Sequence, residues 1–198
     1  NVTNPSLVTD LTALMNPSNY FQVYYSNYIS TLVNNFYVRD TVVNGVTQNM
    51  VECQYSGVPY LFEAGFQWTS LSREHHYPQS WMPTYFDGNF DQSEEVSDLH
   101  NLTPVWQNQV NAVRSNYPYG EVVNATSTYQ DCMLGTNSIG QTVYEMRDSF
   151  KGNAARAIMY HAVKNNTATD DFSLPEQISL VIQYGQNEYL LKQWHFQD

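Results

Sequence analysis

The sequence predicts an α+β fold, in which strands precede a polar helix and further helices. Residues 37–52 are rich in Val and Thr around Asn44-Gly45, a pair that favours a tight hairpin turn. Residues 59–71 are aromatic and partly alternate with polar residues, which also indicates strands. Residues 152–164 place alanine and aliphatic side chains on one face of a predicted helix.

Helix start signals predict two longer helices. Residues 17–35 repeat apolar side chains at i, i+3 and i+4, and residues 16–18 (Asn-Pro-Ser) are typical of a helix start. Thr103-Pro104 begins another helix, because Thr suits the N-cap and Pro suits the first turn. We expect that helix to end near Asn116, where Asn-Tyr-Pro follows.

The remaining segments predict one domain with no linker. Residues 174–182 and 186–196 are expected to form two short helices, and residues 83–99 are expected to form a loop with little regular structure. The chain has 198 residues and contains no internal repeat or low-complexity tract. We therefore treat residues 1–198 as a single domain.

The composition is acidic and contains no membrane or secretory segment. Nineteen acidic and eight basic residues give a net charge of -11, which by itself argues against binding to phosphates. No stretch approaches the roughly 18 apolar residues of a membrane helix. Residues 1–10 have no secretory signal, so we expect that none existed or that it was removed. Cys53 and Cys132 are compatible with one disulfide or with two buried thiols.

Reactive side chains concentrate in three short segments. These are Arg73-Glu74-His75-His76-Tyr77-Pro78, Asp98-Leu99-His100-Asn101-Leu102, and the set Asn108, Asn111 and Arg114. An imidazole suits the deprotonation of water in phosphodiester hydrolysis, and Glu and Asn oxygens suit a hard ion such as Mg²⁺. Neighbouring residues on a strand point to opposite faces, so Glu74 and His75 can share one site only if the backbone bends or twists there.

Five blocks, in order along the chain, resemble those of one nuclease family. They are SREHHYPQSW (72–81), DLHNLTP (98–104), VNAVRSNYPYGEV (110–122), FKGNAARAIMY (150–160) and LLKQWHFQD (190–198). The sequence thus resembles the endonuclease I family of bacterial periplasmic and secreted nucleases, which belongs to the ββα-metal (His-Me finger) class. The resemblance implies a single domain with additional helices around a ββα-metal core at about residues 60–118.

The resemblance implies a role for each matching residue. His75 matches the general base that activates water, and Glu74 matches a metal ligand. Asn111 matches the helix amide that completes the protein's share of the metal coordination. Asn101 matches a residue that steadies the site or touches the ion through water. Arg114 matches an arginine that we place near the reacting substrate backbone.

Three further residues are candidates for substrate binding. We expect Arg73 either to contact a phosphate or to hold another site residue in place. We expect His76 either to line the groove or to pack in the interior. The sequence has one residue more between Pro104 and Asn111 than the family pattern. This changes which side chains of the helix face the site, so Asn108 is an alternative metal ligand. His100 and Asp98 are expected to hold the loop to a helix.

The function that the resemblance implies is hydrolysis of phosphodiester bonds in DNA, or in RNA, without sequence preference. The products would be 5′-phosphate and 3′-hydroxyl ends, and the cofactor would be Mg²⁺ or another divalent ion such as Mn²⁺ or Ca²⁺. We expect a secreted or periplasmic monomer whose partner is nucleic acid and that does not associate with a membrane. The net charge of -11 then requires that cations gather at the site. The arginines expected there are Arg39, Arg73, Arg114 and Arg147.

Two alternatives belong to other functional classes. One is a zinc-dependent hydrolase that uses His75, His76 and His100 as nitrogen ligands. Against it, adjacent histidines differ from the usual zinc pair spaced four residues apart on a helix. The other is a non-catalytic binding protein on the same fold, against which the intact Glu-His and Asn set argues.

Overall fold

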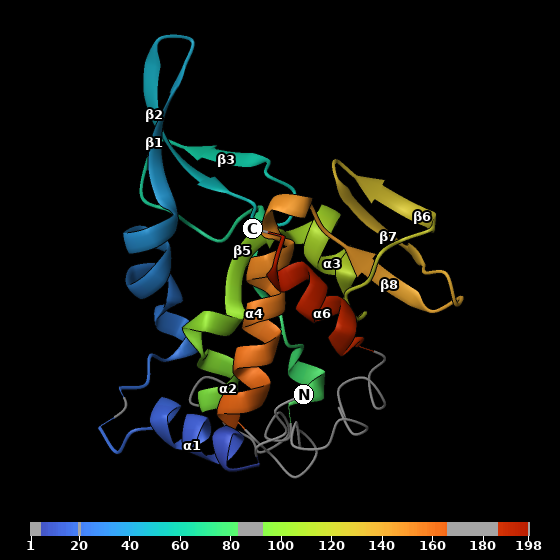
Figure 1. The fold of residues 1–198 in the computed structure, drawn as a ribbon. Coiled ribbons are helices and arrows are strands. Elements are labelled where there is room, and N and C mark those ends of the chain that lie inside the picture. Colours follow the sequence, from blue (N-terminus) through green and yellow to red (C-terminus); the bar gives the residue numbers. More distant parts are fainter. Residues whose placement is uncertain (1–4, 20, 83–92, 166–185, 198) are drawn as a thin grey trace.

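The computed structural model describes residues 5–19, 21–82, 93–165 and 186–197 (Figure 1). Within these residues the protein is a mixed structure of small antiparallel sheets and several helices. The strands are β1 (Val38–Val43), β2 (Val46–Glu52), β3 (Pro59–Phe62), β4 (Leu71–His75), β5 (Leu102–Trp106), β6 (Asn124–Tyr129), β7 (Cys132–Thr136) and β8 (Thr142–Glu145). They pair in the orders β1-β2-β3, β4-β5 and β6-β7-β8.

Helices and short helical turns connect and cover these sheets. The longer ones are α1 (Pro5–Met15), α4 (Asp148–Asn165) and α6 (Glu188–His195). The shorter ones are η1 (Tyr25–Asn27), η2 (Ile29–Tyr37), η3 (Gln79–Trp81), α2 (Glu94–Ser97), η6 (Leu99–Asn101), η7 (Gln107–Asn111) and α3 (Ala112–Arg114). Figure 1 shows α4 near the centre, with the β1–β2 hairpin projecting on one side and the β6–β8 sheet on the other.

The hairpin predicted around Asn44-Gly45 is confirmed. Asn44 and Gly45 have φ angles of 51° and 80°, and Val43 pairs with Val46 across the turn. Two successive left-handed residues define the turn whose twist matches that of the flanking strands. Asn and Gly tolerate this conformation better than other residues, so the local sequence is sufficient to place the hairpin.

The helix predicted over residues 17–35 begins later than expected. The helix α1 ends at Met15, and the side-chain amide of Asn16 donates to the carbonyls of Thr12 and Lys164. Asn16 therefore lies just beyond a helix C-terminus, and its prediction as an N-cap is wrong. The apolar rhythm still corresponds to helical structure, which runs from Tyr25 through η1 and η2.

The prediction that Thr103-Pro104 starts a helix is also wrong, because both residues lie in β5. Thr103 pairs with Glu74 and Pro104 with Arg73 of β4. The backbone bond from the His76 N–H to the Asn101 carbonyl fixes which positions of this ladder are hydrogen-bonded. Hydrogen-bonded pairs alternate in an antiparallel ladder, so the position of Pro104 needs no N–H toward β4. The helical structure begins afterwards, at Gln107.

The C-terminal helices match the prediction where the structure describes them. The helix predicted over residues 152–164 is α4, and the one predicted over residues 186–196 is α6. Residues 174–182 and most of the predicted loop at 83–99 lie outside the described residues. The described part of that loop includes α2 and Asp98.

The interior consists of two clusters of buried apolar side chains. The larger surrounds α4 and contains Ile158, Trp194 and both cysteines, which are free thiols. The smaller contains Tyr28, Val51 and other residues between η2 and the strands. None of the helices within the described ranges has the length and hydropathy required to cross a bilayer.

Candidate active site

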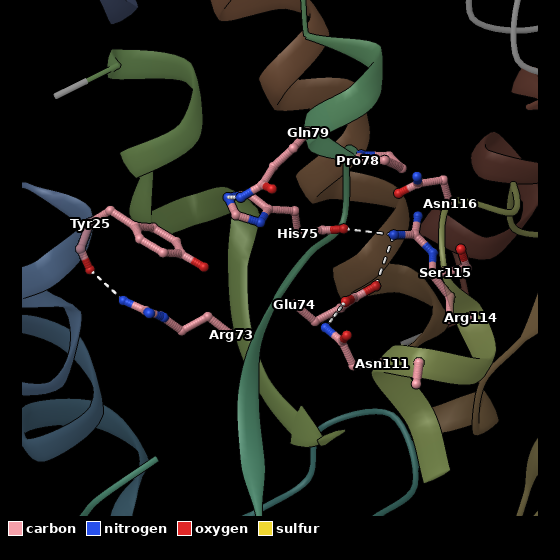
Figure 2. Close-up of a pocket in the computed structure, with 11 residues that line it drawn as sticks. Tyr25, Arg73, Glu74, His75, Pro78, Gln79, Asn111, Arg114, Ser115 and Asn116 are labelled. Atoms are coloured by element: carbon pink, nitrogen blue, oxygen red, sulfur yellow. Dashed lines mark hydrogen bonds and ion pairs between the residues drawn. The ribbon is translucent and has the colours of Figure 1, made fainter. Parts of the chain in front are cut away.

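A cavity of about 320 Å³ opens between the end of β4 and the C-terminal part of the helical segment η7–α3 (Figure 2). Its lining residues are Tyr25, Arg73, Glu74, His75, Pro78, Gln79, Asn111, Ala112, Arg114, Ser115 and Asn116. The cavity thus brings residues 73–75 of the first reactive segment together with Asn111 and Arg114 of the third. The strand end resolves the expected difficulty with Glu74 and His75, because both line the same cavity although they are neighbours in β4.

Glu74 is buried and held by two donors from the helical segment. Its Oε1 atom accepts from Nη1 of Arg114 at 2.8 Å, and its Oε2 atom accepts from Nδ2 of Asn111 at 2.6 Å. Burial raises the pKa of Glu74 to about 7, although Arg114 and Asn111 both lower it. Desolvation therefore outweighs the ion pair, and the carboxyl is poised to exchange a proton near neutral pH.

Asn111 is positioned so that its amide nitrogen and oxygen have different roles. Because Nδ2 donates to Glu74, Oδ1 remains as an oxygen donor beside the carboxylate. Carboxylate and amide oxygens suit a hard divalent ion, and Mg²⁺ usually keeps several waters and needs few protein ligands. The donor set of Glu74 and Asn111 therefore fits such an ion. Among the described residues there is no group of three or more His, Cys, Asp or Glu that could hold a metal.

Arg114 is almost completely buried, with 1% of its side chain exposed. Besides the bond to Glu74, its Nη1 atom donates to the His75 carbonyl and its Nη2 atom to the His76 carbonyl, each at 2.8 Å. Its guanidinium also lies 4.9 Å from the centre of the Tyr119 ring. These contacts commit the side chain to orienting Glu74 and the backbone at the end of β4.

His75 is held in one tautomer by the backbone. Its Nε2 atom lies 2.8 Å from the carbonyl oxygen of Val96, which can only accept, so the proton is on Nε2. The amide nitrogen of Gln79, 3.5 Å from the same atom, then cannot donate to it. The other ring nitrogen, Nδ1, makes no hydrogen bond with any residue in the described part of the chain. Burial lowers the pKa of His75 to about 4, the Val96 bond raises it, and the Arg114 and Arg73 cations lower it further. The imidazole is therefore neutral at pH 7.

Arg73 and Tyr25 complete one wall of the cavity. The Arg73 guanidinium lies 3.8 Å from the centre of the Tyr25 ring, and its Nη1 atom donates to the Tyr25 carbonyl at 2.8 Å. The same ring stacks on His75, with centroids 5.6 Å apart. No sequence motif indicates a role for Tyr25. It is one of 16 tyrosines in the chain, and the segment around it carries no recognisable block. The apolar rhythm of its helix was the available signal, and it indicated packing.

Three predicted site residues lie outside the cavity lining. Asn101 is buried and clamps Tyr77, accepting from its N–H at 2.7 Å and donating to its carbonyl at 3.1 Å. His76 is buried between the hydroxyls of Tyr55 and Tyr119, each 3.1 Å from its Nδ1 atom. Asn108 is exposed on η7. Of the two candidate amides on this helical segment, Asn111 is therefore the one beside Glu74.

The predicted gathering of arginines is correct for two of the four. Arg73 and Arg114 line the cavity. The prediction is wrong for Arg39, which is exposed on β1, and for Arg147, which forms an ion pair with Glu52. Among the described lining residues, Glu74 is the one acid.

The histidines of the zinc alternative are not brought together. His75 bonds to Val96, whereas His76 bonds to two tyrosines in the interior. His100 is exposed and packs on Tyr160, with ring centroids 4.8 Å apart. His75 lines the cavity, whereas His76 is buried outside its lining, so the two rings do not face one ion. The prediction that Asp98 holds its loop to a helix agrees with its buried 2.6 Å ion pair to Lys164 of α4.

Comparison with known proteins assigns the family. None of the curated proteins matches the chain. The family model described as Endonuclease I matches residues 9–198, which is nearly the whole chain. That family consists of nucleases, so the chain is an enzyme that hydrolyses phosphodiester bonds, and the alternative of a non-catalytic binding protein is set aside. Together with the five sequence blocks, this match shows that the chain belongs to the endonuclease I family.

Proposed function

We propose that the chain is a divalent-metal-dependent endonuclease that cleaves DNA or RNA without sequence preference. Its products would have 5′-phosphate and 3′-hydroxyl ends. The observation that carries this proposal is the arrangement of His75, whose Nε2–H is held by Val96 while it shares one cavity with the Glu74–Asn111 pair. The antiparallel pair β4–β5 followed by η7 and α3 is then the ββα-metal motif.

His75 would act as the general base through Nδ1. The bond from Nε2 to the Val96 carbonyl fixes the tautomer, so Nδ1 carries the lone pair that accepts a proton from water. Once protonated, the imidazolium keeps its hydrogen bond to that carbonyl. The negative charge of a bound phosphodiester would raise the pKa of His75, and the positive charge of a divalent ion in the same cavity would lower it.

Glu74 and Oδ1 of Asn111 would hold the divalent ion. When bound, the ion would stabilise the negative charge that develops on the pentacoordinate phosphoryl group and on the leaving 3′-oxygen. Arg114 orients the Glu74 carboxylate and the two carbonyls after it, which makes Arg114 a positioning residue and not a phosphate ligand. Asn101 would also be a positioning residue, because it holds the backbone of Tyr77, two residues after His75.

Arg73 is the residue that we propose for contact with the substrate backbone. Its side chain lines the cavity and is partly exposed, and Nη1 is the atom that bonds to the Tyr25 carbonyl. The guanidinium therefore keeps donors for a phosphate oxygen. A gathered pair of arginines and a divalent ion offset the net charge of -11 at the point where the substrate binds.

We also propose that the enzyme acts as a monomer that is secreted or exported to the periplasm. The support for the compartment is the family and the acidic, lysine-poor composition, with Lys at three positions (151, 164 and 192). Size-exclusion chromatography and fractionation of producing cells test the two statements separately.

Cleavage of supercoiled plasmid by the His75→Ala variant tests the proposal. We expect a rate loss of about 10²- to 10⁴-fold, because a positioned general base contributes that factor. Wild-type activity should disappear with EDTA and return when Mg²⁺ or Mn²⁺ is added in excess. His100→Ala is the matched control, since this exposed histidine lies outside the cavity lining. Cleavage by His75→Ala at the wild-type rate would refute the proposed role.

A further inference from the structure

The ring of Tyr25 lies between the side chains of His75 and Arg73 (Figure 2). The phenol and imidazole rings stack with centroids 5.6 Å apart and planes 16° apart. The Arg73 guanidinium carbon lies 3.8 Å from the centre of the same phenol ring. His75 and Arg73 are two residues apart on β4, so their side chains project from the same face of the strand. Tyr25 therefore fills the space between the two groups that face the substrate.

Tyr25 is anchored from both its backbone and its ring. Arg73 donates from Nη1 to the Tyr25 carbonyl at 2.8 Å, a bond that crosses 48 positions of the sequence. The ring also packs against both apolar clusters of the interior. Its phenol is kept protonated, because burial raises the pKa of Tyr25. The side chain therefore does not compete with His75 as a base.

The contacts of His75 explain why such a ring is needed. The Val96 carbonyl holds the imidazole at one atom, Nε2, and a single hydrogen bond does not by itself fix the plane of a ring. A flat aromatic neighbour at 16° restricts that plane and sets the direction of the Nδ1 lone pair. On its other side, the same ring holds the Arg73 guanidinium by a cation–π contact. One residue thus sets the relative orientation of the base and the nearby cation.

We infer that Tyr25 is a positioning residue for phosphodiester cleavage, which fixes the plane of the His75 imidazole and the direction of the Arg73 guanidinium. This inference rests on the proposed function, in which His75 is the base. Tyr25 lies in the N-terminal segment, outside all five blocks that resemble the family. It supplies the active site with a contact that those blocks do not contain.

Substitutions that keep or remove the ring test this role. Tyr25→Phe keeps both ring contacts and should cleave plasmid within about threefold of wild type. Tyr25→Leu removes them and should lower kcat/KM about 10- to 100-fold, since small misplacements of reacting groups have costs of this size. Tyr24→Leu is the matched control, because Tyr24 is the neighbouring tyrosine and its side chain is exposed. If Tyr25→Leu does not fold, Tyr25→Met fills similar space without a ring and replaces it.

Two readouts separate positioning from general support of the fold. Removal of the ring admits water to His75, so the acidic limb of the pH profile of kcat/KM should shift to higher pH. Binding of Mn²⁺ measured by calorimetry should stay within about threefold of wild type, because Glu74 and Asn111 keep their mutual bond. A ring-less variant with wild-type kcat/KM and an unchanged pH profile would overturn the inference. So would a parallel loss of Mn²⁺ binding.

The outcomes for Tyr25 and His75 are distinguishable. An inactive His75→Ala together with a fully active ring-less Tyr25 variant would leave the proposed base in place and remove Tyr25 from the mechanism. An active His75→Ala would instead refute the proposed function itself, and the inference about Tyr25 with it.

Discussion

Nδ2 of Asn111 donates to Oε2 of Glu74 over 2.6 Å, and this bond joins the helical segment η7 to the end of strand β4. It places the side-chain amide of Asn111 next to the carboxylate of Glu74. Two side chains that carry oxygen ligands, from different elements, are thus held together by a contact between residues 37 positions apart in the chain. An ion held there would lie in the same cavity as His75.

Replacing Asn111 by Ala should weaken Mn²⁺ binding by at least about tenfold and lower plasmid cleavage by a similar or larger factor. The substitution removes one oxygen ligand and the donor that orients Glu74. Asn108→Ala is the matched control on the same helical segment, and its exposed side chain should have little effect. Calorimetry and a nicking assay measure the two quantities. The reverse pattern, with Asn108→Ala impaired and Asn111→Ala normal, would assign the ligand to Asn108.

Replacing Arg114 by Met should destabilise the protein by about 3–5 kcal/mol, because it leaves a buried carboxyl and two buried carbonyls without their donor. Urea denaturation followed by circular dichroism measures the free energy of unfolding. Arg39→Met, on the exposed face of β1, should change it by less than about 0.5 kcal/mol. An inactive Arg114→Met with unchanged stability would show that Arg114 contacts the substrate instead.

Metal affinity should increase as the pH rises through about 7. Burial raises the pKa of Glu74 to about 7, so below that pH a proton competes with the ion for the carboxylate. Calorimetric titration with Mn²⁺ between pH 5.5 and 8, in about half-unit steps, should show an affinity that levels off above the pKa. The Glu74→Gln variant, which has no proton to lose, should bind weakly at every pH. An affinity independent of pH in the wild type would contradict the raised pKa.

Stability should respond to pH in two opposite ways at this site. The folded-state pKa of Glu74 is raised from 4.5 to about 7, so its contribution is complete below pH 4.5 and is lost as the pH rises to about 7. The pKa of His75 is lowered from 6.5 to about 4, so its contribution is complete above pH 6.5 and is lost as the pH falls to about 4. The difference in unfolding free energy between wild type and Glu74→Gln isolates the first effect. Between pH 4.5 and 7 the wild type should lose stability relative to Glu74→Gln as the pH rises. A difference that stays constant over this range would refute the assignment.

The sequence by itself determined the features that depend on neighbouring residues. Asn44-Gly45 placed the hairpin, because those two residues accept the left-handed conformation that the turn requires. The apolar face of residues 152–164 placed α4, and five ordered blocks indicated the family that the whole-chain match confirms. The same blocks named Glu74, His75, Asn111 and Arg114, which the fold brings to one cavity.

The tertiary structure decided what depends on contacts between distant segments. Thr103-Pro104 has the local signal of a helix start, yet pairing with β4 makes it a strand, because a ladder of hydrogen bonds outweighs a weak local preference. Packing between distant segments also sets the helical phase that puts Asn111 beside Glu74. It directs Arg114 to buried carbonyls, and it places Tyr25 between His75 and Arg73. A sequence records which side chains are present, whereas burial and orientation arise when segments tens of residues apart share one interior.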